Sequence, residues 1–209
     1  MAKTGKTARF KIQRRLGTEL PGLGKAGALE RRPYPPGQNG NKRRKFSDYA
    51  LRLEEKQKIR HNYCLKEEQL RRFIRKSKQG AATNWTAKLI GLLESRLDNM
   101  VFRLGFATSI RAARQLVSHK HVLVDGKVVN IASFVVKPGQ KVTLTEKAQQ
   151  NQNFMLAQQS PRLELPDYLT VADEAGKKVG SIINSPGIEH VPFSFDAGLF
   201  TEYYAARNV

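Results

Sequence analysis

The stretch TSIRAARQLVSHKHVLVDGKVVN, residues 108–130, decides the fold of the second half of the chain. Thr108 or Ser109 can cap a helix there, because a side-chain oxygen accepts from backbone N–H groups left free in a first helical turn. The Asp-Gly pair at 125–126 suits the positive backbone angles of a tight turn, so the apolar residues around it predict a hairpin over 121–129. A helix joined directly to a hairpin favours a small module of mixed α and β structure.

The residues on either side extend this module. Core-spaced apolar residues predict one helix from Trp85 to Leu104, and a strand at residues 141–145 follows a Pro-Gly turn. A second hairpin is expected from residues 168–171 and 178–183, with an Ala-Gly turn between them. The module is therefore expected to hold two short helices packed on a small, mostly antiparallel sheet.

Charge is distributed unevenly along the 209 residues. The chain has 37 Lys and Arg against 18 Asp and Glu, and residues 1–80 carry 23 of the basic side chains but only 7 of the acidic ones. The excess of 19 positive charges repels itself in a compact chain unless a polyanion neutralises it. No apolar run approaches the roughly 20 residues that span a bilayer, so nucleic acid is favoured over a membrane as the partner.

The basic half divides into an arm and a helical domain. Residues 1–46 repeat Gly and Pro between basic residues, which predicts an extended arm, the alternative being a disordered tail. Ser47 or Asp48 can cap a helix through residue 63, and a second basic, amphipathic helix is expected over 65–78.

The whole chain is therefore expected to be α+β, with a mainly helical N-terminal domain. The arm covers residues 1–46, the helical domain residues 47–93, and the module with its extra hairpin residues 94–194. A C-terminal helix over 195–209, capped by Asp196, is expected to return to the helical domain.

Catalytic and metal-binding signals are weak. Cys64 is the only cysteine, so an internal disulfide and a zinc site of several cysteines are excluded. His61 precedes it without an oxyanion motif, and His119 and His121 have no third metal ligand nearby. No catalytic residue, cofactor or small-molecule substrate is therefore expected. No apolar signal region follows the N-terminus, which favours a cytoplasmic protein or one made inside an organelle.

Five motifs give the chain a close resemblance to a known family. They are KIQRRLGTEL (11–20), PPGQNG (35–40), SDYALRLEEKQKIRHNY (47–63), LLESRLDNMVFRLGF (92–106) and ARQLVSHKHVLVDGKVVNIASF (113–134). Over the whole chain these stretches resemble the S-four family of small-subunit ribosomal proteins, and the middle of the chain resembles the RNA-binding module named after that family. One class of the family has a zinc-binding cysteine cluster near the N-terminus. This chain resembles the metal-free class.

The resemblance implies a structural protein of the small ribosomal subunit that acts in translation. Members bind early to small-subunit ribosomal RNA at a five-helix junction of its 5′ domain, which nucleates assembly. They lie beside ribosomal proteins three and five where messenger RNA enters, contribute to translational accuracy, and in some cases repress their own operon. The alternatives are a free-standing RNA-binding regulator and an RNA-modifying enzyme fused to the module, although no catalytic domain accompanies the module here.

Basic residues of both domains are the candidate RNA ligands, because phosphates need cations and the deep groove of A-form RNA hides the base edges. The candidates for ribosomal RNA are Arg14, Arg15, Arg43, Arg44, Lys56, Arg60, Arg71, Arg72, Arg75, Arg111, Arg114, Ser118, His119 and Lys120. For each one the alternative is a solvated surface position. By resemblance, Lys42, Arg43 and Lys45 match positions that contact the message, although this cluster could hold ribosomal RNA instead. The family's module often has an arginine directly after its capping residue, where this chain has Ile110, and Arg111 is expected to substitute for it.

Overall fold

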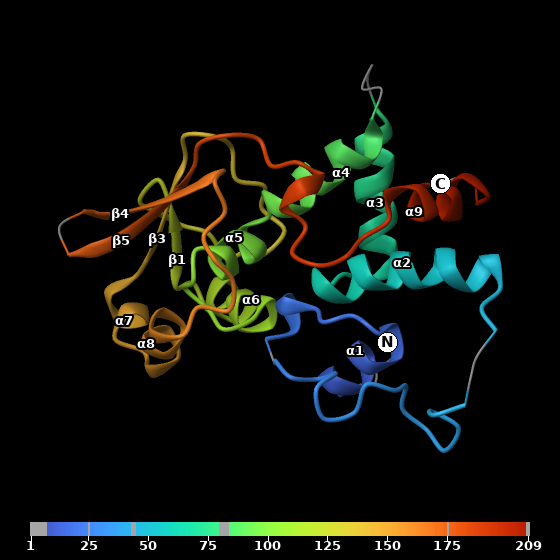
Figure 1. Ribbon diagram of the computed structural model, residues 1–209. Coiled ribbons are helices and arrows are strands. Elements are labelled where there is room, and N and C mark those ends of the chain that lie inside the picture. Colours follow the sequence, from blue (N-terminus) through green and yellow to red (C-terminus); the bar gives the residue numbers. More distant parts are fainter. Residues whose placement is uncertain (1–7, 25, 43–44, 80–83, 175, 208–209) are drawn as a thin grey trace.

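The computed structural model describes residues 8–24, 26–42, 45–79, 84–174 and 176–207, and it has two adjoining parts (Figure 1). The expected α+β class is confirmed, since helices dominate and a small antiparallel sheet lies in the second half of the chain. The helices are α1 Arg9–Leu16, α2 Asp48–Asn62, α3 Glu67–Lys78, α4 Trp85–Glu94, α5 Leu97–Arg103, α6 Ile110–Ser118, α7 Glu146–Gln149, α8 Gln152–Gln159 and α9 Ala197–Ala205, with the 3₁₀ turns η1 Pro21–Leu23 and η2 Ile188–His190. The strands are β1 Val122–Val124, β2 Lys127–Val128, β3 Lys141–Leu144, β4 Leu169–Glu174 and β5 Lys177–Ile182.

The first part is built from α2, α3, α4 and α9. The predicted cap of α2 is confirmed, because the Ser47 side chain accepts from the Ala50 backbone N–H at 3.3 Å. Asp196 caps α9 in the same way, with its Oδ1 3.0 Å from the Leu199 nitrogen. Phe200 of α9 is fully buried in the main hydrophobic core, so the C-terminal helix packs on α2 and closes this part of the protein.

The sheet has the strand order β2-β1-β3-β5-β4, and every neighbouring pair is antiparallel. The predicted tight turn joins β1 to β2, with φ of 49° at Asp125 and 77° at Gly126. The strand β3 connects the two hairpins, because Val142 pairs with Val124 on one side and with Gly180 on the other. Buried residues of α4, α5, α6 and the sheet belong to one hydrophobic core, so the two parts are not separately packed units.

The expected single helix over 85–104 is wrong, because the chain breaks between α4 and α5 at Ser95 and Arg96. Arg96 has an extended backbone, with φ −67° and ψ 140°, and forms an antiparallel bridge with Val135. The Val136 N–H donates to the Ser95 carbonyl oxygen at 2.8 Å. Hydrogen bonds to a distant segment thus replace helical ones at the break, which the spacing of apolar residues could not reveal.

Residues 9–24 differ from the expected extended arm, since they form α1 and η1 and pack on the rest of the protein. Leu20 and Leu23 are fully buried, and the Gly22 N–H donates to the Asn62 side-chain oxygen at 2.9 Å. A Cβ on Gly22 would lie 2.3 Å from the Asn62 carbonyl oxygen, so only glycine allows this approach. In this stretch glycine permits close packing and does not signal an absence of structure.

The buried carboxylate of Glu94 joins both parts of the protein. It lies at the end of α4, and Arg103 of α5 approaches its two oxygens at 3.1 and 3.2 Å. Asn99 Nδ2 and the Tyr168 hydroxyl each donate to it at 2.7 Å, and the Tyr63 hydroxyl completes the set. Burial and the charge of Glu94 raise the pKa of both tyrosines, so both phenols keep their protons and act as donors. The charge of Glu94 on α4 therefore connects this helix to α5, to the residue after α2 and to the residue before β4.

Replacing Glu94→Gln is expected to lower the free energy of unfolding by about 3–5 kcal/mol, because the amide keeps the volume but leaves Arg103 buried without its counter-charge. Urea denaturation followed by circular dichroism measures this loss. The matched control is Glu202→Gln, whose ion pair with Arg52 lies at the surface, with side-chain exposures of 56% and 37%. The control should change the free energy of unfolding by less than about 1 kcal/mol. Equal effects of the two changes would contradict a central role for Glu94.

Candidate nucleic-acid interface

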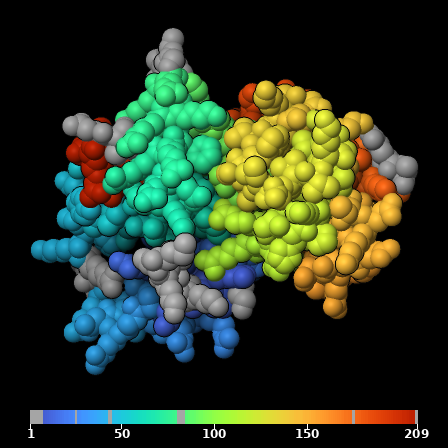
Figure 2. Space-filling view, turned by 180° about the vertical axis from the view of Figure 1, so that it is seen from behind, coloured from blue at the N-terminus to red at the C-terminus, as the bar shows by residue number. Residues whose placement is uncertain are grey.

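The exposed candidate RNA ligands lie on α1, α3, α6 and the residues that follow α6. They are Arg15, Arg72, Arg75, Arg111, Ser118, His119 and Lys120. Figure 2 shows a face on which α3, in blue-green, lies beside the yellow-green surface of α6 and the first hairpin. We call the surface formed by α3, α6 and residues 118–120 the basic face. Both parts of the protein contribute cations to it, so one RNA could contact both.

Lys56 is not part of this surface, which contradicts the prediction that it binds phosphate. Its side chain is buried, and its Nζ lies 2.6 Å from Glu67 Oε2 and 5.3 Å from the centre of the Tyr203 ring. The lysine therefore connects α2 to α3 and α9. The sequence pattern of α2 could not predict these partners, because Glu67 and Tyr203 lie on other helices.

Arg114 was also predicted to bind phosphate, but its guanidinium turns towards partners within the protein. Arg114 Nη2 lies 2.6 Å from the buried Asp98 Oδ2, and its Nη1 donates to the Cys64 carbonyl oxygen at 2.9 Å. Arg96 binds the same carboxylate, with its Nη2 2.8 Å from Oδ2. Arg111 remains exposed on α6. The two arginines of this helix thus differ: Arg114 is partly buried and bound to protein partners, whereas Arg111 is exposed.

Two further candidates have protein partners but stay partly exposed. Arg14 Nε donates to the Tyr34 carbonyl oxygen at 3.0 Å, and the guanidinium lies 5.1 Å from the centre of the Tyr34 ring. Arg71 Nε lies 3.6 Å from Glu67 Oε1, one helical turn away. Arg14 therefore fastens the segment after η1 to α1, and neither arginine is fully available to phosphate.

The message cluster, residues 42–45, follows the segment that Arg14 fastens to α1. Lys42 and Lys45 are exposed. Arg43 and Arg44, expected to contact RNA, lie outside the described residues. The two described lysines are accessible to an RNA strand.

The start of α6 explains why this chain has Ile110 where the family's module often has an arginine. Ser109 caps the helix by accepting from the Ala112 N–H at 3.2 Å. Ile110 is fully buried, and a Cβ added to Gly22 would lie 2.8 Å from its Cδ1, so it packs against η1. This position holds the N-terminal segment in place. Substitution of the family's arginine by Arg111 stays a prediction.

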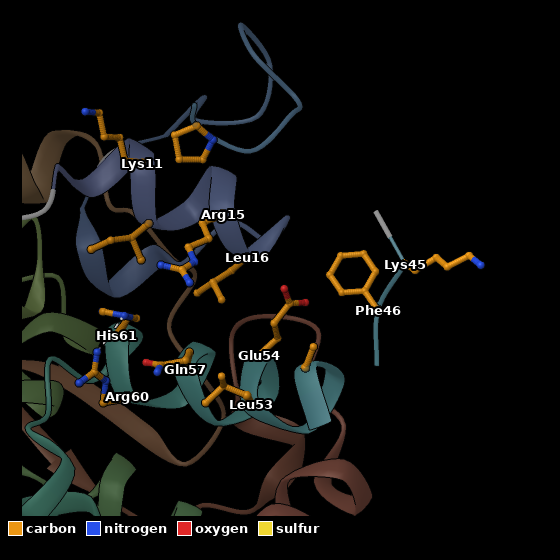
Figure 3. Close-up of a pocket in the computed structure, with 13 residues that line it drawn as sticks. Lys11, Arg15, Leu16, Lys45, Phe46, Leu53, Glu54, Gln57, Arg60 and His61 are labelled. Carbon is orange, nitrogen blue, oxygen red and sulfur yellow. Dashed lines mark hydrogen bonds between the residues drawn. The ribbon is translucent and has the colours of Figure 1, made fainter. Parts of the chain in front are cut away.

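A pocket of about 730 Å³ lies between α1, α2 and residues 45–46 (Figure 3). Arg15, Arg60 and His61 gather at one end of it, and Arg60 Nη2 lies 3.2 Å from His61 Nε2. Burial, followed by the positive charges around the ring, lowers the pKa of His61 to about 4. The ring is therefore neutral at pH 7, and the surrounding cations favour an anion at this end. No sequence signal marked the pocket, because it exists only where α1 lies against α2.

The remaining candidate chemistry involves histidine and cysteine. Among the described residues, no group of three or more His, Cys, Asp or Glu side chains could hold a metal. The rings of His119 and His121 lie 6.4 Å apart. Burial raises the pKa of the Cys64 thiol, which donates to the His61 carbonyl oxygen at 3.7 Å. In the same part of the chain, no helix is both long and apolar enough to cross a bilayer.

Comparison with known proteins covers the whole chain. Residues 5–94 match the model of the ribosomal protein S4/S9 N-terminal domain, and residues 95–142 match the S4 domain. The chain is 61% identical to small ribosomal subunit protein uS4B of Bdellovibrio bacteriovorus, with 100% of both chains covered. It is 45% identical to small ribosomal subunit protein uS4 of a Geobacillus species, over 97% of this chain and 98% of the relative. It is 46% identical to the uS4 protein of Nostoc punctiforme, over 95% and 96%.

The low pKa of His61 predicts a loss of stability in acid. An unfolded His titrates near its ordinary value of 6.5, so protons favour the unfolded chain as the pH falls from about 6.5 towards 4. Between pH 7 and pH 4.5 the folded state should lose about 2 kcal/mol from this group, and His61→Gln should not show this part of the loss. Urea unfolding of both proteins at the two pH values measures the difference. Identical pH responses of the parent protein and His61→Gln would contradict the lowered pKa of His61.

Proposed function

The chain belongs to the uS4 family of small ribosomal subunit proteins, and we propose that it binds small-subunit ribosomal RNA directly through its basic face. Its role is structural and not enzymatic, in keeping with its ribosomal relatives and its S4 domain. The observation that carries the proposal is the presence of exposed cations on two parts of the protein that one core holds in a fixed relation. RNA helices are recognised largely by the shape of their backbone, which requires phosphate ligands at fixed spacing.

We further propose that the site is a five-helix junction in the 5′ domain of that RNA, where binding nucleates assembly of the subunit. Family membership supports this, as does a basic face that spans two rigidly joined parts. Membership likewise supports a position on the cytoplasmic ribosome beside ribosomal proteins three and five, and a contribution to translational accuracy. Repression of its own operon would use the same face on a messenger RNA that imitates the ribosomal site.

We also propose that the message cluster, residues 42–45, contacts messenger RNA where it enters the subunit. The support is the exposure of Lys42 and Lys45, the two residues of this cluster that the structure describes.

Binding to a transcript of the 5′ domain tests the main proposal. The double variant Arg72→Ala with Arg75→Ala should bind more weakly, and the slope of log affinity against log salt should fall by roughly 2, because each neutralised phosphate contributes roughly 0.9. Filter binding over a series of salt concentrations measures both effects. The control replaces the exposed Lys147 and Lys177, which lie on α7 and β5 at the far end of the module (Figure 1). A parent protein whose binding is insensitive to salt would overturn the mechanism.

The message proposal has a separate test. Ribosomes carrying Lys42→Ala, Arg43→Ala and Lys45→Ala should progress more slowly through hairpins in a message, because fewer cations hold the opened strand. Single-ribosome or toe-print kinetics follow this progress. Ribosomes with Arg31→Ala and Arg32→Ala, two exposed changes in the same segment, are the control. Unchanged kinetics in the triple variant would remove message contact as a role of this cluster.

A further inference from the structure

We infer that the pocket between α1 and α2 receives one unpaired nucleotide of the bound RNA, with its base against the apolar wall and its phosphate beside Arg15 and Arg60. This inference rests on the proposed function and deepens it, because it gives the protein a contact with a base as well as with phosphates. Direct base contact with RNA generally involves unpaired nucleotides whose bases have left the stack.

The pocket has an apolar wall of a kind that suits a base. Leu16 of α1 and Leu53 of α2 line it, and Phe46 stands at its open side. Figure 3 shows the Phe46 ring turned towards the pocket, while the neighbouring Lys45 points away. Phe46 is 49% exposed, which is unusual for so large an apolar side chain and leaves its ring free to stack. Stacking on an aromatic ring is a common way for proteins to hold single-stranded RNA.

The cationic end suits the phosphate of the same nucleotide. Arg15 is exposed and extends from α1 towards Arg60 and His61 on α2 (Figure 3). Arg60 Nε is buried and has no hydrogen-bond partner among the described residues. An anion near these groups would supply an acceptor and relieve the repulsion between the two guanidinium groups. One pocket therefore contains both an apolar wall for a base and cations for its phosphate.

An unsatisfied acceptor distinguishes a nucleotide from a simple anion. Gln57 lines the pocket, and its Oε1 is buried and has no donor among the described residues. Glu54 brings a carboxylate to the same wall. If the Gln57 side chain turns into the pocket, its oxygen can accept from the exocyclic amino group of adenine, cytosine or guanine, which a simple anion lacks. A buried amide left without a partner is costly, so its occurrence inside a pocket indicates a missing donor.

The size of the pocket agrees with this occupant. Its volume of about 730 Å³ lies within the range of roughly 300–1,000 Å³ of pockets that hold small ligands. One side is formed by α1, whose Leu16 is buried with Leu20 and Leu23 in a cluster of its own. The pocket thus has firm walls from two helices and one open side towards Phe46.

Titration of the full-length protein with free mononucleotides tests the pocket alone. AMP and CMP are added while the ring signals of His61 are followed by nuclear magnetic resonance, with ribose 5-phosphate and inorganic phosphate as base-free probes. We expect AMP or CMP to bind at least about fivefold more tightly than ribose 5-phosphate, because stacking adds to the phosphate contact. The pKa of His61 should rise on binding, since a negative charge favours the protonated ring. Equal affinity for all four probes, or no shift at His61, would show that the pocket holds no nucleotide.

Two variants connect the pocket to RNA binding. Phe46→Ala and Gln57→Leu should each weaken binding to the 5′-domain transcript about fivefold while leaving its salt slope unchanged, because neither residue is a phosphate ligand. The matched control is Leu51→Ala, which also removes an exposed apolar side chain of the same region but does not line the pocket. Normal affinity in both variants would refute the inference while the proposed function stands. If the parent protein fails to bind the transcript, the proposed function fails, and the mononucleotide titration decides the pocket by itself.

Discussion

The carboxylate of Glu94 is held where water cannot reach it, and a charge in such a place is stable only if protein donors replace its hydration. Two phenols, an amide and a guanidinium meet this requirement, and they come from three segments of the chain. A few residues further on, Asp98 imposes the same requirement and binds both Arg96 and Arg114. Glu94 cannot be satisfied unless the helical part, which supplies Tyr63, and the module, which supplies the other donors, meet at one angle. The spacing of cations on the basic face follows from that constraint.

Local signals in the sequence predicted local structure well. A capping side chain and the turn it begins lie within four residues, so Ser47, Ser109 and Asp196 could be placed without knowledge of the fold. The Asp-Gly turn between β1 and β2 is similarly self-contained. The break between α4 and α5 was missed because its cause is a hydrogen bond to residue 136, some forty positions away.

Which cations face outward was harder to predict. A lysine or arginine on an amphipathic helix has the same sequence pattern whether it binds phosphate or an internal carboxylate. Lys56 and Arg114 were assigned to RNA, but the protein's own Glu67 and Asp98 bind them. Those carboxylates come from other helices, and only the tertiary structure brings them close. The pocket beside α1 could not be foreseen for the same reason, since its walls come from helices that are far apart in the sequence.

The position of α9 has a consequence for how the protein is made. This helix follows the module in the chain but packs on α2, where Arg52 pairs with Glu202 and the backbone N–H of Asp196 donates to Glu55. Until α9 has been synthesised, the buried face of α2 and the ammonium group of Lys56 lack part of their cover. The module is complete earlier and needs only contacts that precede α9, so it can fold first during synthesis. The helical domain, although it is encoded first, is expected to mature last.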